Sequence, residues 1–426
     1  MVASFKIKLT VSVAAIGIVA ISLASCGDQA TLPVSAGAGA YPQLPSPNSA
    51  LFPTVNIAPA KGWTDNAGPV SAPGLKVATF ADGLDHPRWL YVLPNGDVLV
   101  AETNAPPKPE DGKGIKGWFM RRFMSEAGAT SPTANRITLL RDADGDGVAE
   151  THSLFLRDLN SPFGMALVGD TLYVANTDAV MKYPYKSGET LISDPGIKVA
   201  DLPAGPINHH WTKSLIASRD GEHLYVGVGS NSNAGENGID KEDGRAAIWE
   251  IDPVNGAHSV FASGLRNPVG LAWEPVGGNL WAVVNERDEL GSDLVPDYLT
   301  SVKYGGFYGW PYSYFGANED PAHRGERPDL VQRAIVPDMA LGAHVAALVG
   351  GEDLSEGACA VEFDAHDFRP PLRKLSRIRD LLPYGFGRGG QRGLTAHAGH
   401  GLRLAAAACT ARPPGSGEKG TQVADQ

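Results

Sequence analysis

The chain has 426 residues and a formal net charge of −11 at pH 7, which argues against nucleic acid as a partner because phosphate binding requires basic surface patches. Its 51 glycines and 32 prolines, with only 19% charged residues, favour a turn-rich all-β protein over a helical one. Its three cysteines do not indicate a disulfide framework. The length allows two or three domains, although one large β domain can fill most of it.

Residues 1–26 have the features of an export signal peptide. Lysines precede an apolar run at residues 9–23, which is short for a membrane span, and the segment ends in Leu-Ala-Ser-Cys. These four residues resemble a bacterial lipobox, whose cysteine, here Cys26, is lipidated; an ordinary cleavage site or a membrane anchor are the alternatives. Gly27, and not aspartate, follows, so the resemblance implies no inner-membrane retention. We therefore expect a periplasmic protein of the bacterial cell envelope, lipid-anchored to the outer membrane.

Residues 27–74 are rich in proline, alanine, glycine and serine and have no sustained hydrophobic period. This composition is typical of a flexible linker and predicts a tether between the membrane and a folded domain. We expect that domain to begin near Leu75, where short strand patterns separated by turn residues start.

Four segments of similar pattern follow, each with a polar residue, a first apolar strand, a hairpin turn and a second apolar strand. The segments cover residues 84–102, 159–176, 203–233 and 265–284. Their first polar residues are Asp85, Asn160, His210 and Asn267, at steps of 75, 50 and 57 residues. These steps approach the period of a propeller blade, roughly 40 to 50 residues. The pattern predicts an all-β propeller whose polar residues face one axis; a β-sandwich meander is the alternative.

The third segment carries the main candidate for proton transfer. His209 and His210 precede a predicted hairpin that turns at Asp220-Gly221, a dipeptide favoured in tight turns. A neutral imidazole at the rim of a propeller can accept a proton near pH 7. The alternative is that both histidines are surface turn residues, so the candidate depends on what else lies beside them.

A metal site is suggested by Asp142, Asp144 and Asp146, which alternate along a glycine-containing loop and are followed by Glu150. Alternating carboxylates on such a loop can converge on one Ca²⁺, as in the first half of an EF-hand. The twelfth position is Ser153, so the bidentate glutamate of a true EF-hand is missing. We predict a structural metal site, with a bare Asp-Gly-rich turn as the alternative.

The fourth segment leads into an acidic loop, residues 285–298, close in the sequence to Arg266. A planar guanidinium suits carboxylate groups, and Asp293 together with loop carbonyl oxygens suits Ca²⁺. A base, a cation and anionic ligands are therefore predicted at one mouth of the propeller.

Three motifs in this part of the chain are similar to those of the glucose/sorbosone dehydrogenase family, and nearest to its sorbosone dehydrogenase branch. They are Gly-Leu-Arg-Asn-Pro-Val-Gly-Leu-Ala at residues 264–272, the acidic loop with Asp293, and Tyr-Gly-Gly-Phe-Tyr-Gly-Trp-Pro at residues 304–311. The resemblance covers about residues 75–345. The motifs are specific in combination, whereas Arg-Asn-Pro alone is weak.

The resemblance implies a six-bladed β-propeller that binds pyrroloquinoline quinone (PQQ) with Ca²⁺ and oxidises a sugar or a sugar aldehyde. His210 matches the histidine that takes the substrate hydroxyl proton while a hydride passes to C5 of the quinone. Arg266 matches the arginine that polarises the quinone oxygens, and Asn267 lies with it at the cofactor. Electrons then pass to an external acceptor, while the protein supplies orientation and electrostatics.

The same resemblance implies roles for further residues. The backbones of Arg287 and Asp288 fall where the family provides carbonyl ligands to the cofactor-bound Ca²⁺, and Asp293 falls where an acidic side chain supports that site. Glu286 stands where the glucose dehydrogenases have glutamine. At the position of their aspartate behind the histidine this chain has Ser230, which implies a weaker base. The expected cofactor-binding residues are Asn160, Ser230, Asn267 and Glu286.

The family pattern is absent from residues 347–426, which are rich in arginine, glycine and alanine and have no strand period. We hypothesise that the coding frame changes near this point. The propeller domain then covers residues 75–346, with room for about five blades, and is followed by a divergent tail of low order. Its last blade is incomplete, and the late lysine and arginine residues that hold the PQQ carboxylates in the family have no evident counterpart.

Two other functions fit parts of the pattern. One is a Ca²⁺-dependent, lactonase-like propeller hydrolase, which needs acidic and asparagine side chains around a central ion. The other is an inactive binding propeller of the envelope, which the divergent tail favours. Lactone hydrolysis without PQQ would establish the first, and absence of turnover with PQQ and Ca²⁺ would favour the second.

Overall fold

The computed structural model describes residues 29–33, 35–48, 69, 77–107 and 131–344, a few positions between 118 and 128, and the backbone of three strands at 347–350, 360–363 and 402–404. The predictions for the signal segment 1–26, including lipidation of Cys26, lie outside these residues. In the part of the chain that is described, no helix is long and apolar enough to cross a membrane.

Four antiparallel sheets form the body of the molecule. The first contains β2 (Pro87–Val92), β3 (Val98–Glu102), β4 (Arg136–Arg141) and β5 (Thr151–Leu156). The second contains β6 (Met165–Val168), β7 (Thr171–Ala175), β8 (Ala179–Pro184) and β9 (Ile197–Asp201). The third contains β10 (Leu215–Ala217), β11 (Leu224–Val228), β12 (Ala247–Ile251) and β13 (His258–Ser263), extended by the parallel strand β17 (Gly306–Phe307). The fourth contains β14 (Pro268–Trp273), β15 (Leu280–Val284), β16 (Pro296–Ser301) and β20 (Met339–Ala343).

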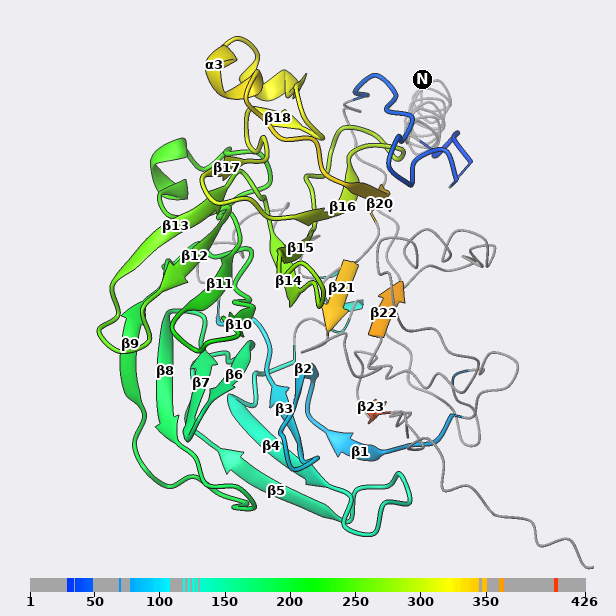
Figure 1. Cartoon of the computed structure of the whole chain (residues 1–426). Coiled ribbons are helices and arrows are strands. Elements are labelled where there is room, and N and C mark those ends of the chain that lie inside the picture. The colour runs from blue at the N-terminus through cyan, green and yellow to red at the C-terminus, as the bar shows by residue number, and fades with distance from the viewer. Residues whose placement is uncertain are drawn as a thin grey trace, which may run out of the picture.

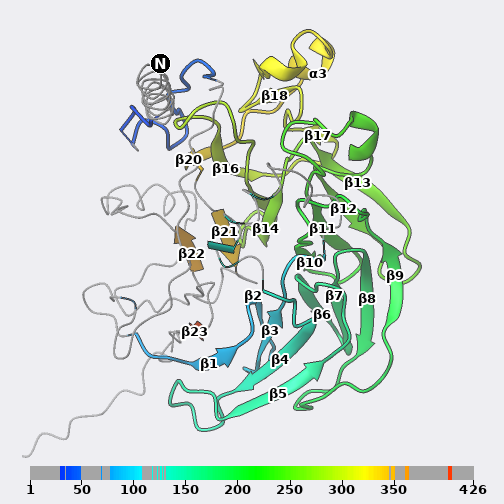
Figure 2. The ribbon, with the colours of Figure 1, turned by 180° about the vertical axis from the view of Figure 1, so that it is seen from behind.

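These sheets are arranged as propeller blades. In Figure 1 they fan around a common centre, with β2, β6, β10 and β14 innermost and β5, β9 and β13 at the periphery. The view from behind in Figure 2 shows the same radial order. The all-β propeller expected from the four repeats is therefore confirmed, one blade per repeat.

The predicted number of blades differs from the observed number. Residues 75–346 were expected to hold about five blades, whereas the described residues hold four. Two long excursions use the remaining length. One lies between β3 and β4. The other runs from β16 to β20 and contains β17, β18 (Ser313–Tyr314), β19 (Asn318–Glu319), the 3-10 helix Pro321–His323 and the short helix α3 (Pro328–Val331). Six blades are not reached within the described part of the chain.

Turn chemistry explains the inner hairpins of the blades. Each hairpin from the first to the second strand turns next to a glycine with positive φ, a conformation that other residues adopt at a cost. These glycines are Gly96, Gly169, Gly221 and Gly278. Gly221 belongs to the Asp-Gly pair from which the third hairpin was predicted. The second strands β3 and β11 are buried along their whole length, as expected for strands covered on both faces.

The hydrophobic core is divided among the junctions between blades. One cluster joins the first and second blades, a second joins the second and third, and a third joins the third and fourth. The last of these contains Tyr298, Tyr308, Leu294 and Leu265, all essentially inaccessible to solvent. Adjacent blades are thus held face to face, which fixes the relative position of loops that come from different repeats.

Strands also occur beyond residue 346, where the composition predicted none. β21 (Ala347–Gly350) pairs with β22 (Ala360–Phe363) and lies against β14 and β15 of the fourth blade. β23 (Leu402–Leu404) pairs with β1 (Ala81–Leu84). The hypothesis of a changed reading frame stays a hypothesis.

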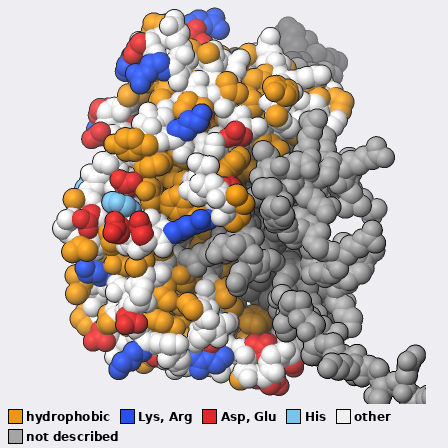
Figure 3. Space-filling view, viewed as in Figure 1, with side chains coloured by type: hydrophobic (Ala, Val, Ile, Leu, Met, Phe, Trp, Pro, Cys, Tyr) orange, Lys and Arg blue, Asp and Glu red, His pale blue; other side chains and the backbone are white. Residues whose placement is uncertain are grey.

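The segment predicted to be a flexible tether is in part attached to the fourth blade. Within residues 29–48, Gly39 forms an antiparallel bridge with Ala340 of β20, and Leu44 packs against the core cluster of the third and fourth blades. Composition alone does not reveal this, because the contacts are made largely by backbone groups. In Figure 3 acidic and basic side chains are interspersed with apolar ones on the face shown.

Candidate active site

The polar ends of the four repeats lie at one rim of the propeller because of the strand register. In the first blade Pro87, at the start of the inner strand, pairs with Glu102 at the end of the second strand. In the fourth blade Pro268 pairs with Val284 in the same way. The residues before each inner strand and those after each second strand therefore meet. Of the four polar residues of the repeats, His210 and Asn267 are brought together, as both flank Gly229, whereas Asn160 is exposed and Asp85 pairs with Arg136 of the first blade.

His210 is held by Ser230, which follows β11. The His210 Nδ1 atom lies 2.9 Å from the Ser230 carbonyl oxygen and 3.0 Å from Ser230 Oγ. Ser230 Oγ donates its own hydrogen to the Ser232 carbonyl oxygen at 2.6 Å. Both neighbours of Nδ1 are thus acceptors, so Nδ1 carries the proton and Nε2 has a free lone pair.

The electrostatic surroundings keep this imidazole neutral. Burial and the nearby Arg266 guanidinium hold the pKa of His210 well below its usual value, and the hydrogen bond to Ser230 opposes this only in part. A ring with a depressed pKa and an unprotonated Nε2 can accept a proton at and below neutral pH. The Ser230 position also agrees with the departure noted in the sequence, because a hydroxyl and a carbonyl stand behind the histidine in place of a carboxylate.

Gly229 brings the third and fourth repeats into direct contact. A Cβ atom placed on it would lie 2.4 Å from His210 Cβ and 2.4 Å from Asn267 Oδ1. His210 and Asn267 therefore flank the same backbone position, closer than any side chain at residue 229 would allow. This close approach places the candidate base beside the Arg266-Asn267 pair.

Arg266 is buried and bound by loops of both blades. Its Nε donates to the Asn233 carbonyl oxygen at 3.1 Å and its Nη2 donates to Asn233 Oδ1 at 2.9 Å. Its Nη1 donates to the Glu286 carbonyl oxygen, and the Asp288 carboxylate lies 3.6 Å away. Burial lowers the pKa of Arg266 while the surrounding carboxylates raise it. The guanidinium is thus a fixed cation next to His210.

Two buried carboxyl groups lie beside this cation. Glu286 has a pKa raised to about 7 by burial, against the opposing charge of Arg266. Burial also raises the pKa of Asp297 well above its usual value, and Asp297 Oδ1 accepts from the Glu286 backbone N–H at 2.6 Å. Two oxygens here, Glu286 Oε1 and Asn267 Oδ1, are buried without a hydrogen-bond partner among the described residues. Such groups are rare in folded proteins unless a ligand or water meets them.

The residues expected to provide carbonyl ligands are engaged with other groups. The Asp288 carbonyl oxygen accepts from Asn233 Nδ2 at 3.2 Å and from Arg287 Nε at 2.8 Å. The Arg287 Nη1 atom donates to both carboxylate oxygens of the buried Asp320, at 3.0 and 2.9 Å. The Asp288 side chain contacts His344 Nδ1 at 3.1 Å. A cation bound by the Asp288 carbonyl would therefore replace one of these donors.

Asn160 and Asp293 have other contacts than those expected. Asn160 is exposed, and its carbonyl oxygen accepts from the Thr177 backbone N–H at 3.0 Å within the second blade. Asp293 Oδ2 accepts hydrogen bonds from the N-terminal residues Thr31 and Leu32. The structure brings together His210, Ser230, Arg266, Asn267, Glu286 and Asp288, and it places Asn160 and Asp293 outside that group.

Sequence reasoning missed the residues that fix the loop of His210. Arg245 is buried and its Nη1 donates to Asn208 Oδ1 at 3.0 Å, while its Nη2 donates to the Ala204 carbonyl oxygen at 2.7 Å. Asn208 Nδ2 donates to Thr177 Oγ1, which donates to the Trp211 carbonyl oxygen, both at 2.9 Å. Asn233, which joins Arg266 to Asp288, was also missed. Its place in a polar cluster just after β11 was the available signal.

Lys213 is a second buried cation of this loop. Its side chain is inaccessible to solvent, and its Nζ donates to the Trp211 carbonyl oxygen at 3.3 Å. Burial lowers the pKa of Lys213 to about 7, with a smaller contribution from the positive charge of Arg245. The amine thus changes charge near neutral pH, close to the segment that carries His210.

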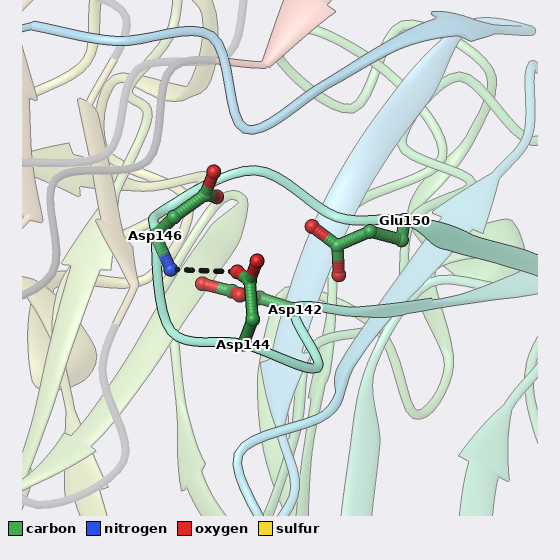
Figure 4. A group of neighbouring side chains, drawn as sticks. All are labelled: Asp142, Asp144, Asp146 and Glu150. Carbon is green, nitrogen blue, oxygen red and sulfur yellow. Dashed lines mark hydrogen bonds between the residues drawn. The ribbon is translucent and has the colours of Figure 1, made fainter.

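The predicted metal loop of the first blade lies apart from this site. Asp142, Asp144, Asp146 and Glu150 offer carboxylate oxygens that all lie within 4.8 Å of one another, on the loop between β4 and β5 (Figure 4). Backbone N–H groups of the same loop donate to these carboxylates, among them Gly145 N to Asp142 Oδ1 at 2.7 Å. The convergence expected from the sequence is present, and the metal-binding role stays a prediction.

The amino-acid sequence and the fold were compared with those of known proteins. The model of the TrAA12-like family matches residues 69–297. A "Pyrroloquinoline quinone-dependent sugar dehydrogenase" of Hypocrea jecorina is 25% identical over 273 residues, which is 58% of this chain and 57% of that protein. An uncharacterised protein of Synechocystis is 24% identical over 357 residues, 78% of each chain. The chain thus spans little more than half of the fungal relative's length.

Solved structures share the fold. The holo form of the pyranose dehydrogenase PQQ domain from Coprinopsis cinerea has a TM-score of 0.51 and 19% identity, over 66% of this chain and 71% of that one. A calcium structure of a family AA12 protein from Trichoderma reesei has a TM-score of 0.51 and 20% identity, over 69% and 76% of the two chains. At these identities the likeness supports the propeller fold alone.

Proposed function

The chain belongs to the TrAA12-like family, and on this basis we propose that it is a quinoprotein dehydrogenase that oxidises a sugar or a sugar aldehyde with PQQ and Ca²⁺. The observation that carries the proposal is the neutral His210, locked through Nδ1 by Ser230 and flanked by Arg266 and Asn267. The curated relative from Hypocrea jecorina, a PQQ-dependent sugar dehydrogenase, supports the same reaction class.

The residues at the rim fit such a cofactor. PQQ carries carboxylate and quinone oxygens, for which the buried Arg266 guanidinium is a suitable partner. Asn267 Oδ1 and Glu286 Oε1 lack hydrogen-bond partners among the described residues, and both are oxygens of the kind that Ca²⁺ prefers. We propose that Arg266 and Asn267 hold the quinone and that Glu286, with the loop at Arg287 and Asp288, holds the ion.

The protein groups would act on the proton and on orientation. His210 Nε2 takes the hydroxyl proton of the substrate, because Nδ1–H is committed to Ser230. Arg266 stays charged and fixed by Asn233 and Glu286, so it needs no rearrangement to face developing negative charge. PQQ, when bound, supplies the acceptor for the hydride. The electrons then leave to an external acceptor, and the proton leaves from His210 to solvent.

Ser230 sets the strength of this base. A carboxylate behind the imidazole would stabilise the protonated ring, whereas a carbonyl and a hydroxyl do so less. With the pKa of His210 lowered, the ring is ready to accept a proton over a wide pH range, but it holds that proton weakly. We propose that this favours substrates whose hydroxyl proton is easily removed, a class that includes both the hydrated aldehyde of sorbosone-type sugars and the anomeric hydroxyl of aldoses.

The location of the protein stays a proposal based on its first residues. We propose that Cys26 is lipidated and that the protein faces the periplasm from the outer membrane. Labelling with a radioactive fatty acid, followed by membrane fractionation, tests this. Cys26→Ala is the matched variant, and label that persists in it would contradict the proposal.

The proposed activity is tested by titration of the purified full chain with PQQ and Ca²⁺. Binding is followed by PQQ fluorescence, and turnover by dye reduction with sorbosone and with aldoses. We expect saturable binding and turnover that disappears in His210→Gln while binding remains. Binding without turnover would leave an envelope binding propeller, and no binding would remove the quinoprotein function from this chain.

A Ca²⁺-dependent hydrolase is the second candidate, and one observation favours it. The unpartnered oxygens at the rim belong to the side chains of Asn267 and Glu286, as a lactonase-like site would require, and the Asp288 carbonyl is already engaged. Hydrolysis of a sugar lactone with Ca²⁺ and without PQQ would establish it. Dye reduction that depends on PQQ would exclude it as the main activity.

A further inference from the structure

The N-terminal segment 29–48 contacts the fourth blade at three separate places. Thr31 N and Thr31 Oγ1 donate to Asp293 Oδ2 at 2.7 and 3.0 Å, and Leu32 N donates to the same oxygen at 3.2 Å. Gly39 N donates to the Ala340 carbonyl oxygen at 2.8 Å, and Ala340 N donates back at 2.9 Å. We call this segment the strap. In Figures 1 and 2 it lies beside β16 and β20.

Two of the three contacts fall on residues 285–295, the part of the acidic loop that connects β15 to β16. Asp293 belongs to this loop, and so does Leu290, whose carbonyl oxygen accepts from Asn48 N at 2.9 Å. Leu44 of the strap packs against the core cluster that contains Leu290 and Leu294. The strap therefore binds the acidic loop at both of its own ends and along its apolar side.

The acidic loop also carries the polar groups of the candidate site. Asp288 N donates to Asn233 Oδ1 at 2.9 Å, and the Asp288 side chain contacts Arg266 and His344. Glu286 N donates to Asp297 Oδ1. Loops are among the more mobile parts of a fold, so contacts that fix this loop from outside also fix the polar groups that it carries.

We infer that the strap positions the acidic loop and that Asp293 is its anchor, a positioning residue and not a support for a metal ion. One Asp293 oxygen accepts three hydrogen bonds, all from the strap, and hydrogen bonds to a charged acceptor are among the stronger ones. The part of the inference that concerns Ca²⁺ rests on the proposed function. The part that concerns the strap and the loop does not.

The first test is amide hydrogen exchange on the full chain without PQQ or added Ca²⁺. The strap amides of Thr31, Leu32, Gly39 and Asn48 donate to the fourth blade, so we expect slow exchange at each. In Thr31→Pro, which removes both Thr31 donors and leaves Asp293 intact, we expect exchange at Leu32, Gly39 and Asn48 to accelerate about tenfold or more, and in Asp293→Ala we expect the same at all four sites. Thr31→Ser keeps both donors and is the control.

The same measurement reads the position of the acidic loop. We expect the amides of Glu286 and Asp288 to accelerate in both Thr31→Pro and Asp293→Ala, although neither substitution touches these residues. Strap amides that exchange like a free peptide in the wild type would overturn the inference. So would loop amides that stay slow when the strap amides have become fast.

A Ca²⁺ titration separates an anchor from a metal-supporting residue. With the PQQ-loaded protein we expect a roughly tenfold weaker Ca²⁺ affinity in Thr31→Pro and in Asp293→Ala alike, with Thr31→Ser close to wild type. Weaker affinity in Asp293→Ala alone would show that Asp293 acts on the ion, against the inference. If no variant and no wild-type protein binds PQQ, the proposed function fails while the exchange experiment still decides the role of the strap.

Discussion

Two acidic loops of this propeller look alike in the sequence and differ in the structure. The loop of the first blade carries Asp142, Asp144 and Asp146 on its exposed side, and its carboxylates accept hydrogen bonds from their own backbone. The acidic loop of the fourth blade buries Glu286, raises its pKa to about 7 and, within the part of the chain that is described, gives one of its carboxylate oxygens no hydrogen-bond partner. Burial and an unmet hydrogen-bonding capacity, more than the number of carboxylates, make the fourth-blade loop the stronger candidate for a ligand site.

The two loops also differ in how they are held. The first is a self-contained turn between two adjacent strands, whereas the second depends on Asn233 of the third blade, on Arg266 and on the strap. A site assembled from several repeats can place unlike charges close together. It can also be disrupted by a change in any of the repeats that contribute to it.

The largest effect is expected at the base. His210→Gln removes the proton acceptor while keeping a hydrogen-bonding side chain of similar size, and general-base catalysis contributes roughly 10²- to 10⁴-fold. We expect dye reduction by the PQQ-loaded protein to fall by about that factor, with PQQ affinity within a few-fold of wild type. His209→Gln is the control, because His209 is the exposed neighbour of His210 in the same turn. Equal losses in both variants would contradict the assignment of His210.

The close approach at Gly229 gives the next prediction. In Gly229→Ala the added methyl group would overlap His210 Cβ and Asn267 Oδ1, so the two residues must move apart. We expect a loss of stability of about 1–3 kcal/mol, as for other overpacked sites, and a loss of PQQ affinity. Thermal unfolding and PQQ fluorescence measure the two.

Gly164→Ala is the matched control for this steric effect. A Cβ atom there would lie 2.3 Å from Leu215 N, at the junction of the second and third blades and away from Asn267. We expect Gly164→Ala to lose about as much stability as Gly229→Ala. Its PQQ affinity should fall less than that of Gly229→Ala. An affinity that falls in parallel with stability in both variants would mean that Gly229 has only a packing role.

The repeats allowed much of this fold to be predicted, and their limits are equally clear. The polar residue before each inner strand and the Asp-Gly turn located the blades, since both are local patterns of a few residues. Arg245 and Asn208 could not be paired in advance, because they are joined across 37 positions with no periodic relation between them. The strap has a linker composition, and its attachment, made mostly by backbone donors such as those of Thr31, Gly39 and Asn48, is seen in the structure alone.

Burial of charge gives a pH prediction at Lys213. Its pKa is about 7 in the folded chain and about 10.4 in the unfolded chain, so between these values the unfolded state binds one more proton. The free energy of unfolding therefore rises by about 1.4 kcal/mol per pH unit, because of this group, as the pH rises from 7 toward 10. The same contribution is lost when the pH is lowered back to 7. Lys213→Met should remove this slope, measured by urea unfolding at pH 7, 8 and 9.

An exposed lysine supplies the comparison for Lys213. Lys198 pairs with Asp201 on the surface, and Lys198→Met should leave the pH dependence of unfolding close to that of wild type. If Lys213→Met unfolds with the same slope as wild type, the amine is not the buried group that the structure indicates.

The smallest effect is expected at the loop of the first blade, and it tests the difference between the two acidic loops most directly. If Asp142, Asp144 and Asp146 bind Ca²⁺, the ion stabilises the folded chain by mass action, and Asp142→Asn should remove a rise of a few degrees in Tm on adding Ca²⁺ to PQQ-free protein. Turnover of the PQQ-loaded protein should be unchanged, because this loop shares no contact with His210 or Arg266 among the described residues. If the rise in Tm with Ca²⁺ remains in Asp142→Asn but is lost in Glu286→Gln, the ion binds at the fourth blade alone. The carboxylates of the first-blade loop would then only form a hydrogen-bonded turn.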